Sequence, residues 1–353
     1  MSFLLILRVS LMDGGAGMMW CSKLASYISL VLFSVLAGAS HAQEDGSIVA
    51  WGDNSSGQCT VPSPNKGFVA IAAGSAFCLG LKEDGSIVAW GDNSSGQCTV
   101  PSPNTGFVAI AAGGAFCLGL KEDGSIVVWG NDYCGQCDVP SPNTGFVAVA
   151  AGSAHSLGLI EDGSIVTWGY NYFGQCDVPA PNTNFVDMAG GYYHSLGLKE
   201  DGSIVAWGYN YAGQCNVPAP NTHFVNMAGG GEHSLGLKED GSIVAWGDNS
   251  EGQCNVPAPN TGFVNVRSGL DHSLGLKEDG SIVAWGDNSA GQCDIPDSNT
   301  VFVNAAGGYY HNLGQVSWIP SPVRASLNSS SLLCPSSSDH IFTADSRDLP
   351  LLH

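Results

Sequence analysis

Positive charge is scarce in this sequence. The 353 residues include 11 Lys and Arg against 31 Asp and Glu, which gives a net charge of −20. A surface of this sign repels phosphate backbones, so we expect no nucleic-acid partner. Fourteen of the acids belong to a repeated Glu-Asp pair, and these acids can equally serve to keep a large apolar particle in solution.

The usual signatures of chemistry are also missing. The sequence has no catalytic-triad signature, no phosphate-binding loop and no zinc motif. Its repeated Asp-Asn-Ser-x-Gly segments, the first at 53–57, do not have the ligand spacing of an EF-hand. We therefore predict no catalytic residue, no metal and no cofactor, and expect a protein that is not an enzyme.

What the sequence does have is a repeat of 39 residues. The segment Glu-Asp-Gly-Ser-Ile-Val-Ala-Trp-Gly at 44–52 returns, with small changes, from Glu83, Glu122, Glu161, Glu200, Glu239 and Glu278. Each copy continues into Gly-Gln-Cys and then Val-Pro or Ile-Pro. Repeats of this length that are built from short β-type segments are typical of solenoids and propellers.

Four short β-strands are predicted within each copy. In the copy that supplies Asp84-Gly85 they cover 68–72, 78–81, 86–90 and 97–100, and Asp84-Gly85 forms the hairpin between the second and the third. Apolar residues occupy both faces of the first and third strands, which requires cover on both sides, as in blades stacked around a ring. The predicted fold is all-β, a seven-bladed β-propeller of four-stranded blades.

The two ends of the repetitive region complement each other. The third and fourth strands of a blade come first, at 47–61, and the first and second strands come last, at 302–313. Pairing the N-terminal strands with the C-terminal strands completes the seventh blade and removes the open edges of the ring. We assign the propeller to 43–315.

Both terminal regions fall outside the repeat. An apolar run at 24–36, followed by small residues, predicts a signal peptide over 1–42, with Met18 or Met19 as an alternative start. An uncleaved anchor is the alternative, although the run is short for a membrane span. We expect a secreted or periplasmic protein without membrane contact after cleavage. The Ser- and Pro-rich tail at 316–353 is predicted to be disordered, and a shifted reading frame would look the same.

The repeat resembles a known family. Ala-Gly-x-x-His-Ser-Leu-Gly-Leu at 151–159, followed by Asp-Gly-Ser-Ile-Val-x-Trp-Gly and Gly-Gln-Cys, is similar to the regulator of chromosome condensation repeat. The resemblance covers 43–315 and implies a seven-bladed propeller. The Val-Pro after Gly-Gln resembles bacterial secreted members, which include a propeller-type β-lactamase inhibitor protein. Family members also include guanine-nucleotide exchange factors, but a signal peptide and an acidic body fit that nuclear role poorly.

The copies differ mainly at one face. In an antiparallel blade the loops between strands 1–2 and 3–4 share one face, and the 2–3 hairpins and 4–1 connectors share the other. The second face is nearly unchanged between copies, whereas the first is rich in Tyr, which protein interfaces favour. The predicted binding residues are Tyr133, Tyr170, Tyr172, Phe173, Tyr192, Tyr193, Tyr209, Tyr211, Glu232, Asp271, Tyr309 and Tyr310. Packing of these aromatics only on neighbouring loops is the alternative.

These residues predict a monomeric, non-enzymatic scaffold that binds a protein partner of unknown identity. The alternative is a carbohydrate-binding or hydrolytic propeller that acts at the central funnel, where aromatic rings could stack on sugars.

Other repeated residues are interpreted as structural. Five copies carry His at one position, where two earlier copies have Phe77 and Phe116, which indicates that the His rings fill space. The repeated Trp fills space between blades, and the repeated Cys is too far from its equivalents to form disulfides. Cys134 and Cys137 form a C-x-x-C that is compatible with a local disulfide and, less well, with a redox site.

Overall fold

The structure, a computed structural model, describes residues 46–296 and 301–316. Within these ranges all regular elements are β-strands, which form seven sheets of three. No helix in the described part of the chain is long and apolar enough to cross a membrane. The signal peptide predicted for 1–42 lies outside the described residues, as does the predicted tail beyond Val316.

Each sheet is one blade with a first, second and third strand, and we number the blades by the copy that supplies the third strand. The first strands are β20 (Phe302–Gly307), β2 (Phe68–Ala73), β5 (Phe107–Ala112), β8 (Phe146–Ala151), β11 (Phe185–Gly190), β14 (Phe224–Gly229) and β17 (Phe263–Ser268), for blades 1 to 7. The second strands are β21 (His311–Val316), β3 (Phe77–Lys82), β6 (Phe116–Lys121), β9 (His155–Ile160), β12 (His194–Lys199), β15 (His233–Lys238) and β18 (His272–Lys277). The third strands are β1 (Ser47–Gly52), β4 (Ile87–Gly91), β7 (Ile126–Gly130), β10 (Ile165–Gly169), β13 (Ile204–Gly208), β16 (Ile243–Gly247) and β19 (Ile282–Gly286).

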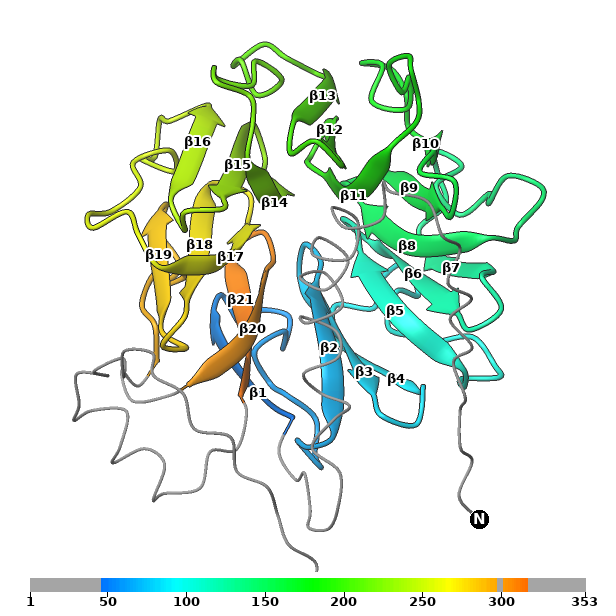
Figure 1. Cartoon of the computed structure of the whole chain (residues 1–353). Coiled ribbons are helices and arrows are strands. Elements are labelled where there is room, and N and C mark those ends of the chain that lie inside the picture. The colour runs from blue at the N-terminus through cyan, green and yellow to red at the C-terminus, as the bar shows by residue number, and fades with distance from the viewer. Residues whose placement is uncertain (1–45, 297–300, 317–353) are drawn as a thin grey trace, which may run out of the picture. The chain divides into compact units, whose positions relative to one another are not determined.

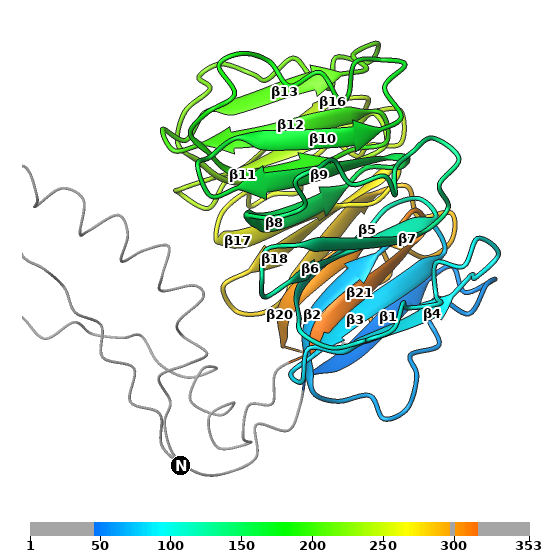
Figure 2. The same ribbon diagram turned by 90° about the vertical axis from the view of Figure 1, so that its right-hand side faces the viewer.

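The blades are arranged around a common centre, and their first strands lie nearest to it (Figure 1). All strand pairs are antiparallel, with the second strand in the middle of each sheet. In the view turned by 90°, the strands of a blade lie side by side, and the sheet of β8–β10 is layered against that of β11–β13 (Figure 2). This order places one end of every first strand at the centre of the same face.

The predicted fourth strand is wrong in the residues that the structure describes. The segment at 97–100 is not a strand: 97–98 lie in a turn, with Thr99 N donating to Gly96 O at 2.9 Å. A side chain replaces the missing strand, because Asn104 Oδ1 accepts from Ile87 N and Asn104 Nδ2 donates to Ile87 O, both at 2.8 Å. The Asn of the Pro-x-Pro-Asn connector thus satisfies backbone groups of the third strand that a fourth strand would otherwise pair.

Blade 1 combines the two ends of the repetitive region, as predicted. β1 pairs with β21 from Ser47 opposite Val316 to Gly52 opposite His311. The indole Nε1 of Trp51 donates to Gln292 O of blade 7 at 3.0 Å. In the other blades the equivalent Trp makes the same bond to the preceding copy.

The hydrophobic core is divided into clusters between neighbouring blades. One cluster joins Phe77, Leu79 and Ile87 of blade 2 to Phe107 and Trp129 of blade 3, and every one of these side chains is buried. This arrangement explains why both faces of a strand are apolar, since each sheet is covered by a blade on either side. The structure confirms the predicted position of Trp between blades.

Candidate binding face

The loops after the first and third strands share one face, as predicted, and we call it the loop face. Tyr209 N, just after β13, donates to Tyr193 O, between β11 and β12, at 2.9 Å. The loops between first and second strands are also linked from blade to blade, for example by Gly114 N to Ser153 O at 2.9 Å. The opposite face, the hairpin face, carries the 2–3 hairpins and the connectors, joined by bonds such as Glu83 N to Gly67 O at 3.2 Å.

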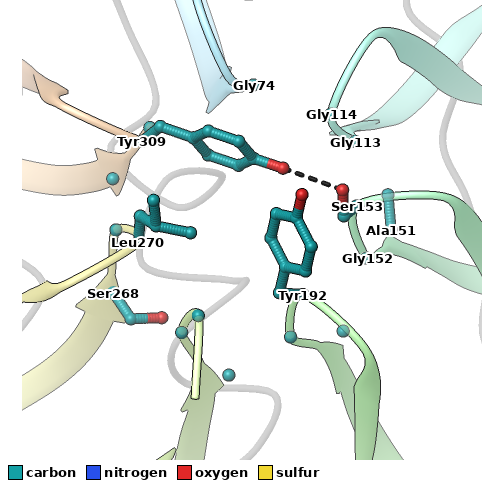
Figure 3. Close-up of a pocket in the computed structure, with 18 of the residues that line it drawn as sticks. Gly74, Gly113, Gly114, Ala151, Gly152, Ser153, Tyr192, Ser268, Leu270 and Tyr309 are labelled. Atoms are coloured by element: carbon teal, nitrogen blue, oxygen red, sulfur yellow. Dashed lines mark hydrogen bonds between the residues drawn. The ribbon is translucent and has the colours of Figure 1, made fainter. Parts of the chain in front are cut away.

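A pocket of about 110 Å³ lies at the centre of the loop face and is lined by all seven blades. Most of the lining is glycine because the blades converge there. A Cβ added at Gly190 would lie 2.5 Å from Gly152 N of the neighbouring blade. Three larger side chains enter the space, those of Tyr192, Leu270 and Tyr309 (Figure 3). The funnel is therefore narrow and partly filled at this end.

The ring of Tyr309 extends across this pocket. Its hydroxyl lies 2.8 Å from Ser153 Oγ of blade 4, and its ring centroid lies 5.8 Å from that of Tyr192 in blade 5 (Figure 3). Burial is the main cause that raises the pKa of the Tyr309 hydroxyl, so this group stays protonated at neutral pH. Sequence reasoning missed Ser153, because nothing in a small loop residue signals a partner so distant in the chain.

Eight of the predicted aromatic residues form one contiguous cluster on the loop face. Tyr193 is its centre, with ring centroids at 4.3 Å from Tyr192, 5.2 Å from Phe173 and 5.6 Å from Tyr170. Phe173 in turn lies 4.8 Å from Tyr209. We define the aromatic cluster as Tyr170, Tyr172, Phe173, Tyr192, Tyr193, Tyr209, Tyr211 and Tyr309.

Two members of the aromatic cluster stand out into solvent. Tyr172 is 79% exposed and Tyr211 is 88% exposed. Each stacks on an inner Tyr of its own loop, Tyr172 on Tyr170 at 6.5 Å and Tyr211 on Tyr209 at 6.4 Å. The cluster thus consists of a packed base with two exposed rings held above it.

The loops that carry these stacked pairs differ from the repeat in a specific way. In blade 2, Asp92 accepts hydrogen bonds from Ser94 Oγ and from the buried Gln97 Nε2, both at 2.8 Å. In blade 4 the positions of Asp92 and Ser94 are taken by Tyr170 and Tyr172. A hydrogen-bonded Asp–Ser pair is replaced by a stacked Tyr–Tyr pair, and blade 5 shows the same replacement.

This replacement leaves two buried amides without a partner. Among the residues that the structure describes, nothing accepts a hydrogen bond from Gln175 Nε2 or Gln214 Nε2. In the other five blades the equivalent amide donates to an Asp or Asn side chain. A buried donor without a partner costs about 1–3 kcal/mol. Blades 4 and 5 therefore lose stability at the same loops where they gain exposed aromatic surface. Local features that cost stability in this way are expected at functional sites.

Four predicted residues lie on the loop face outside the aromatic cluster. Tyr133, in the loop after β7, is 94% exposed and makes no ring contact in the part of the chain that the structure describes. Tyr310 follows Tyr309 and is 39% exposed. Glu232 and Asp271 occupy the loops between first and second strands of blades 6 and 7. The structure thus brings these two acids to the same face as the aromatic cluster.

The five His residues of the repeat are buried links between blades. His155 Nε2 lies 2.9 Å from Ser195 Oγ of the next blade, whose hydroxyl donates to Gln175 O at 2.9 Å. The hydroxyl proton is used in that second bond, so His155 donates through Nε2–H and is neutral. Burial lowers the pKa of His155 to about 3 and that of His194 to about 4. These observations support the predicted structural role.

The repeated thiols are poor candidates for chemistry. Cys59 Sγ donates to Asp53 O at 3.1 Å, and burial raises the pKa of Cys59 to about 11. Burial, together with the charges of Asp132 and Asp138, raises the pKa of Cys137 to about 12. The reactive thiolate of a redox site is therefore disfavoured. Within residues 46–296 and 301–316 no group of three His, Cys, Asp or Glu could hold a metal ion.

Six segments of the sequence match the family described as Regulator of chromosome condensation (RCC1) repeat, at 68–97, 107–136, 146–175, 185–214, 224–253 and 263–292. Together they cover about half of the chain. The chain belongs to the RCC1 repeat family. The seventh copy has no match. Its strands are divided between the two ends of the repetitive region, so its residues are not continuous in the sequence. No curated protein matches the sequence.

Several solved structures share the propeller. Prp20p from Saccharomyces cerevisiae, described with its binding properties to Gsp1p and histones, has a TM-score of 0.70 and 17% identity, over 82% of this chain and 95% of that one. Human WBSCR16 has a TM-score of 0.62 and 18% identity, over 77% and 100%. The ectodomain of the Physcomitrella patens receptor kinase CR4 has a TM-score of 0.61 and 21% identity, over 71% and 70%. Structural similarity at such low sequence identity shows the RCC1 propeller fold but does not assign a function.

Proposed function

We propose that this protein is a non-enzymatic scaffold that binds a protein partner through the aromatic cluster. The observation that carries the proposal is the replacement made in blades 4 and 5. There the Nε2 groups of Gln175 and Gln214 have no acceptor among the described residues, and Tyr172 and Tyr211 are exposed to solvent. Proteins retain such an unfavourable arrangement where it has a use. Large rigid rings on a packed base offer contact area at a low entropic cost.

The other blades show that the fold does not need these rings. The position of Tyr172 and Tyr211 carries Ser in blades 1, 2, 6 and 7. The position of Tyr192 carries Ser or Gly in blades 2, 3, 4 and 6. Aromatic side chains required by the propeller itself would recur in every copy, as Trp does. Their restriction to a few copies, whose rings meet in one cluster, therefore favours a binding surface.

The central funnel is less well suited to carbohydrate binding or hydrolysis. Its volume of about 110 Å³ is below the roughly 300–1,000 Å³ of typical small-molecule pockets. The residues that line it are Gly, Ala, Ser, Leu and Tyr, whereas glycoside hydrolysis uses a pair of carboxyl groups. The fold relative Prp20p is described with protein partners, which agrees with the scaffold and favours no particular partner.

The setting of the protein forms part of the proposal. The apolar run at 24–36 supports secretion or a periplasmic location, and the net charge of −20 argues against nucleic acid as a partner. We infer that the protein acts as a monomer. We also infer that the pairing of β1 with β21 closes the ring, which leaves the loop face as one continuous rigid surface.

The proposal is tested by affinity capture with three forms of the full chain. The wild type, the double variant Tyr172→Ala/Tyr211→Ala and the hairpin-face variant Glu122→Gln/Asp123→Asn are immobilised, and proteins bound from extracts of the source organism are quantified. The partner should bind the wild type and the hairpin-face variant and be lost from the double variant. Equal capture by all three forms, or binding only on a polysaccharide array, would overturn the proposal.

A further inference from the structure

A patch of carboxylates adjoins the aromatic cluster on the loop face. Burial is the largest cause that raises the pKa of Asp271, followed by the charges of four acids from blades 6 and 7. The backbone also places these acids together, since Asp248 N donates to Glu232 O and Asp287 N donates to Asp271 O, each at 2.8 Å. The loops of Glu232 and Asp271 are joined by the bond from Gly231 N to Leu270 O at 2.7 Å. We define the acidic patch as Glu232, Asp248, Glu251, Asp271 and Asp287.

The acidic patch meets aromatic rings on two sides. Burial, then the charge of Glu232, raises the pKa of the Tyr209 hydroxyl. Burial, then the charges of Asp271 and Asp287, raises the pKa of Tyr310. Backbone hydrogen bonds join the same loops, from Tyr192 N to Gly230 O at 2.9 Å and from Leu270 N to Tyr309 O at 3.3 Å. The aromatic cluster and the acidic patch are thus adjoining parts of one surface that runs over blades 4 to 7 and blade 1.

No Lys or Arg neutralises this surface within the described residues. Every described Lys either is the last residue of a second strand, next to the 2–3 hairpin, or belongs to a connector. These Lys residues lie on the hairpin face, where Lys82 Nζ lies 3.4 Å from the centroid of the Phe68 ring. The one described Arg, Arg267, lies within β17 and donates to Ala305 O and Asn265 Oδ1. In the part of the chain that the structure describes, the loop face therefore has anionic side chains and no Lys or Arg.

Three acids of the patch form no side-chain hydrogen bonds with the described part of the propeller. Asp248 and Asp287 accept from the buried amides of Gln253 and Gln292. By contrast, the carboxylates of Glu232, Glu251 and Asp271 accept no hydrogen bond from residues that the structure describes. The position of Glu232 and Asp271 carries Ala in blades 2, 3 and 4. The propeller folds around Ala there, so these acids are free to serve an external ligand.

We propose that the partner presents a segment rich in Arg and Lys, which lies across the aromatic cluster and the acidic patch. Arg fits both parts of this surface, because its planar guanidinium stacks on aromatic faces and donates two parallel hydrogen bonds to a carboxylate. The positive charge of a cation bound beside Asp271 offsets the repulsion from its four acidic neighbours. This inference rests on the proposed function and adds the chemistry of the partner.

The test uses a phage-displayed library of random 15-residue peptides selected on the full-length protein. We expect the selected peptides to be enriched in Arg and Lys. A synthetic peptide from the selection should bind at least tenfold more weakly to the variant Glu232→Gln/Glu251→Gln/Asp271→Asn. The matched control, Glu122→Gln/Glu161→Gln/Glu200→Gln, removes the same charge from the hairpin face and should bind as the wild type does. Raising salt from 0.05 M to 0.5 M should remove most of the difference.

Other outcomes separate the two proposals. If neutral peptides are selected, and lost with Tyr172→Ala/Tyr211→Ala but not with the neutralised acidic patch, the scaffold stands and the cationic partner is wrong. If binding survives both sets of changes, the loop face is not the binding site and both proposals fail. If spermine competes as well as the peptide at equal charge, the surface recognises charge alone and the peptide segment is wrong. Thermal unfolding of each variant shows that it is folded.

Discussion

The hydroxyl of Tyr309 in blade 1 lies 2.8 Å from Ser153 Oγ in blade 4. The two residues are 156 positions apart in sequence, and their blades are not neighbours. The bond therefore joins two sides of the propeller across the central pocket, in addition to the bonds that join each blade to the next. It also fixes the ring of Tyr309 against Tyr192, which belongs to the base of the aromatic cluster.

Replacing Tyr309 with Phe tests this cross-link. The ring and its contact with Tyr192 are kept, and only the hydrogen bond to Ser153 is lost. We expect the free energy of unfolding to fall by about 1 kcal/mol, measured by denaturant titration. The control Tyr310→Phe, at an exposed residue, should leave stability unchanged. Equal stability of both variants and the wild type would show that the Ser153 bond contributes nothing.

The unpartnered amide of Gln175 leads to a second prediction. Tyr170→Asn and Tyr170→Ala both remove the ring, but only Asn offers an oxygen to Gln175 Nε2. Asn131 already accepts the equivalent bond from Gln136 in blade 3, at 3.1 Å. Tyr170→Asn should therefore be more stable than Tyr170→Ala by about 1 kcal/mol, while both lose partner binding to the same extent. A denaturant titration that cannot distinguish the two variants would mean that the amide imposes no cost on the fold.

Much of this architecture follows from the sequence because each inter-blade contact recurs with the repeat. The apolar faces predict stacked blades, and the split copy predicts the pairing of β1 with β21. The fourth strand was predicted wrongly because Gln97 to Val100 alternate as a strand does. Instead, the side chain of Asn104 pairs with the backbone groups of Ile87 in the third strand. Asn104 is in a connector, and the local sequence pattern does not predict hydrogen bonds to a residue so far away.

The candidate site was predictable in composition but not in arrangement. Tyr in variable loops is visible in the sequence, and so is its restriction to one face. The loss of the Asp92-type acceptor in blades 4 and 5 can be read by aligning the copies, yet its meaning depends on knowing that Gln175 is buried. The contact between Ser153 and Tyr309 depends on the diameter of the ring, which no local pattern encodes.

A third prediction concerns the two exposed rings. Tyr172→Ala and Tyr211→Ala should each weaken partner binding by about 1–3 kcal/mol, with stability nearly constant because these side chains bury little. Calorimetric titration with the captured partner measures the first effect and thermal unfolding the second. Tyr133→Ala is the matched control, since Tyr133 occupies the equivalent loop position but stands apart from the aromatic cluster. An equal loss for Tyr133→Ala would show that exposure, and not membership of the cluster, determines binding.

The buried His residues predict a loss of stability in mild acid. The pKa of His194 is about 4 in the folded state and about 6.5 in the unfolded chain. The unfolded state therefore binds the proton first, and stability falls as pH drops from 6.5 toward 4, by about 1.4 kcal/mol per pH unit for one such group. Above pH 6.5 the group is neutral in both states and has no effect.

The variant His194→Phe isolates this contribution, because Phe77 and Phe116 occupy the same position in other blades. Between pH 6.5 and 4.5 its free energy of unfolding should fall less steeply than that of the wild type. The difference in slope should be that of one bound proton, about 1.4 kcal/mol per pH unit. Asp187 and Asp271 have raised pKa values and act in the opposite sense, but they are common to both proteins and cancel in the difference. Parallel pH profiles would mean that His194 is not buried as a neutral group.

The last prediction concerns ring closure and compares two Trp residues. Trp51 Nε1 donates to Gln292 O at 3.0 Å across the junction of blades 1 and 7, and Trp90 Nε1 donates to Gln58 O at 2.9 Å between blades 2 and 1. If the ring is closed, Trp51→Phe and Trp90→Phe remove equivalent buried bonds and should lower the free energy of unfolding by similar amounts, at least about 1 kcal/mol each.

An open ring would give a different result. The contact between blades 1 and 7 would then form only part of the time, and Trp51→Phe would cost much less than Trp90→Phe. Deleting residues 43–61 extends the comparison, since it removes β1 and exposes the edge of β21. A closed propeller should then unfold at a clearly lower temperature. Blade 1 loses its third strand, and both neighbouring blades lose their contacts with that strand. Cooperative unfolding at the wild-type temperature would contradict closure.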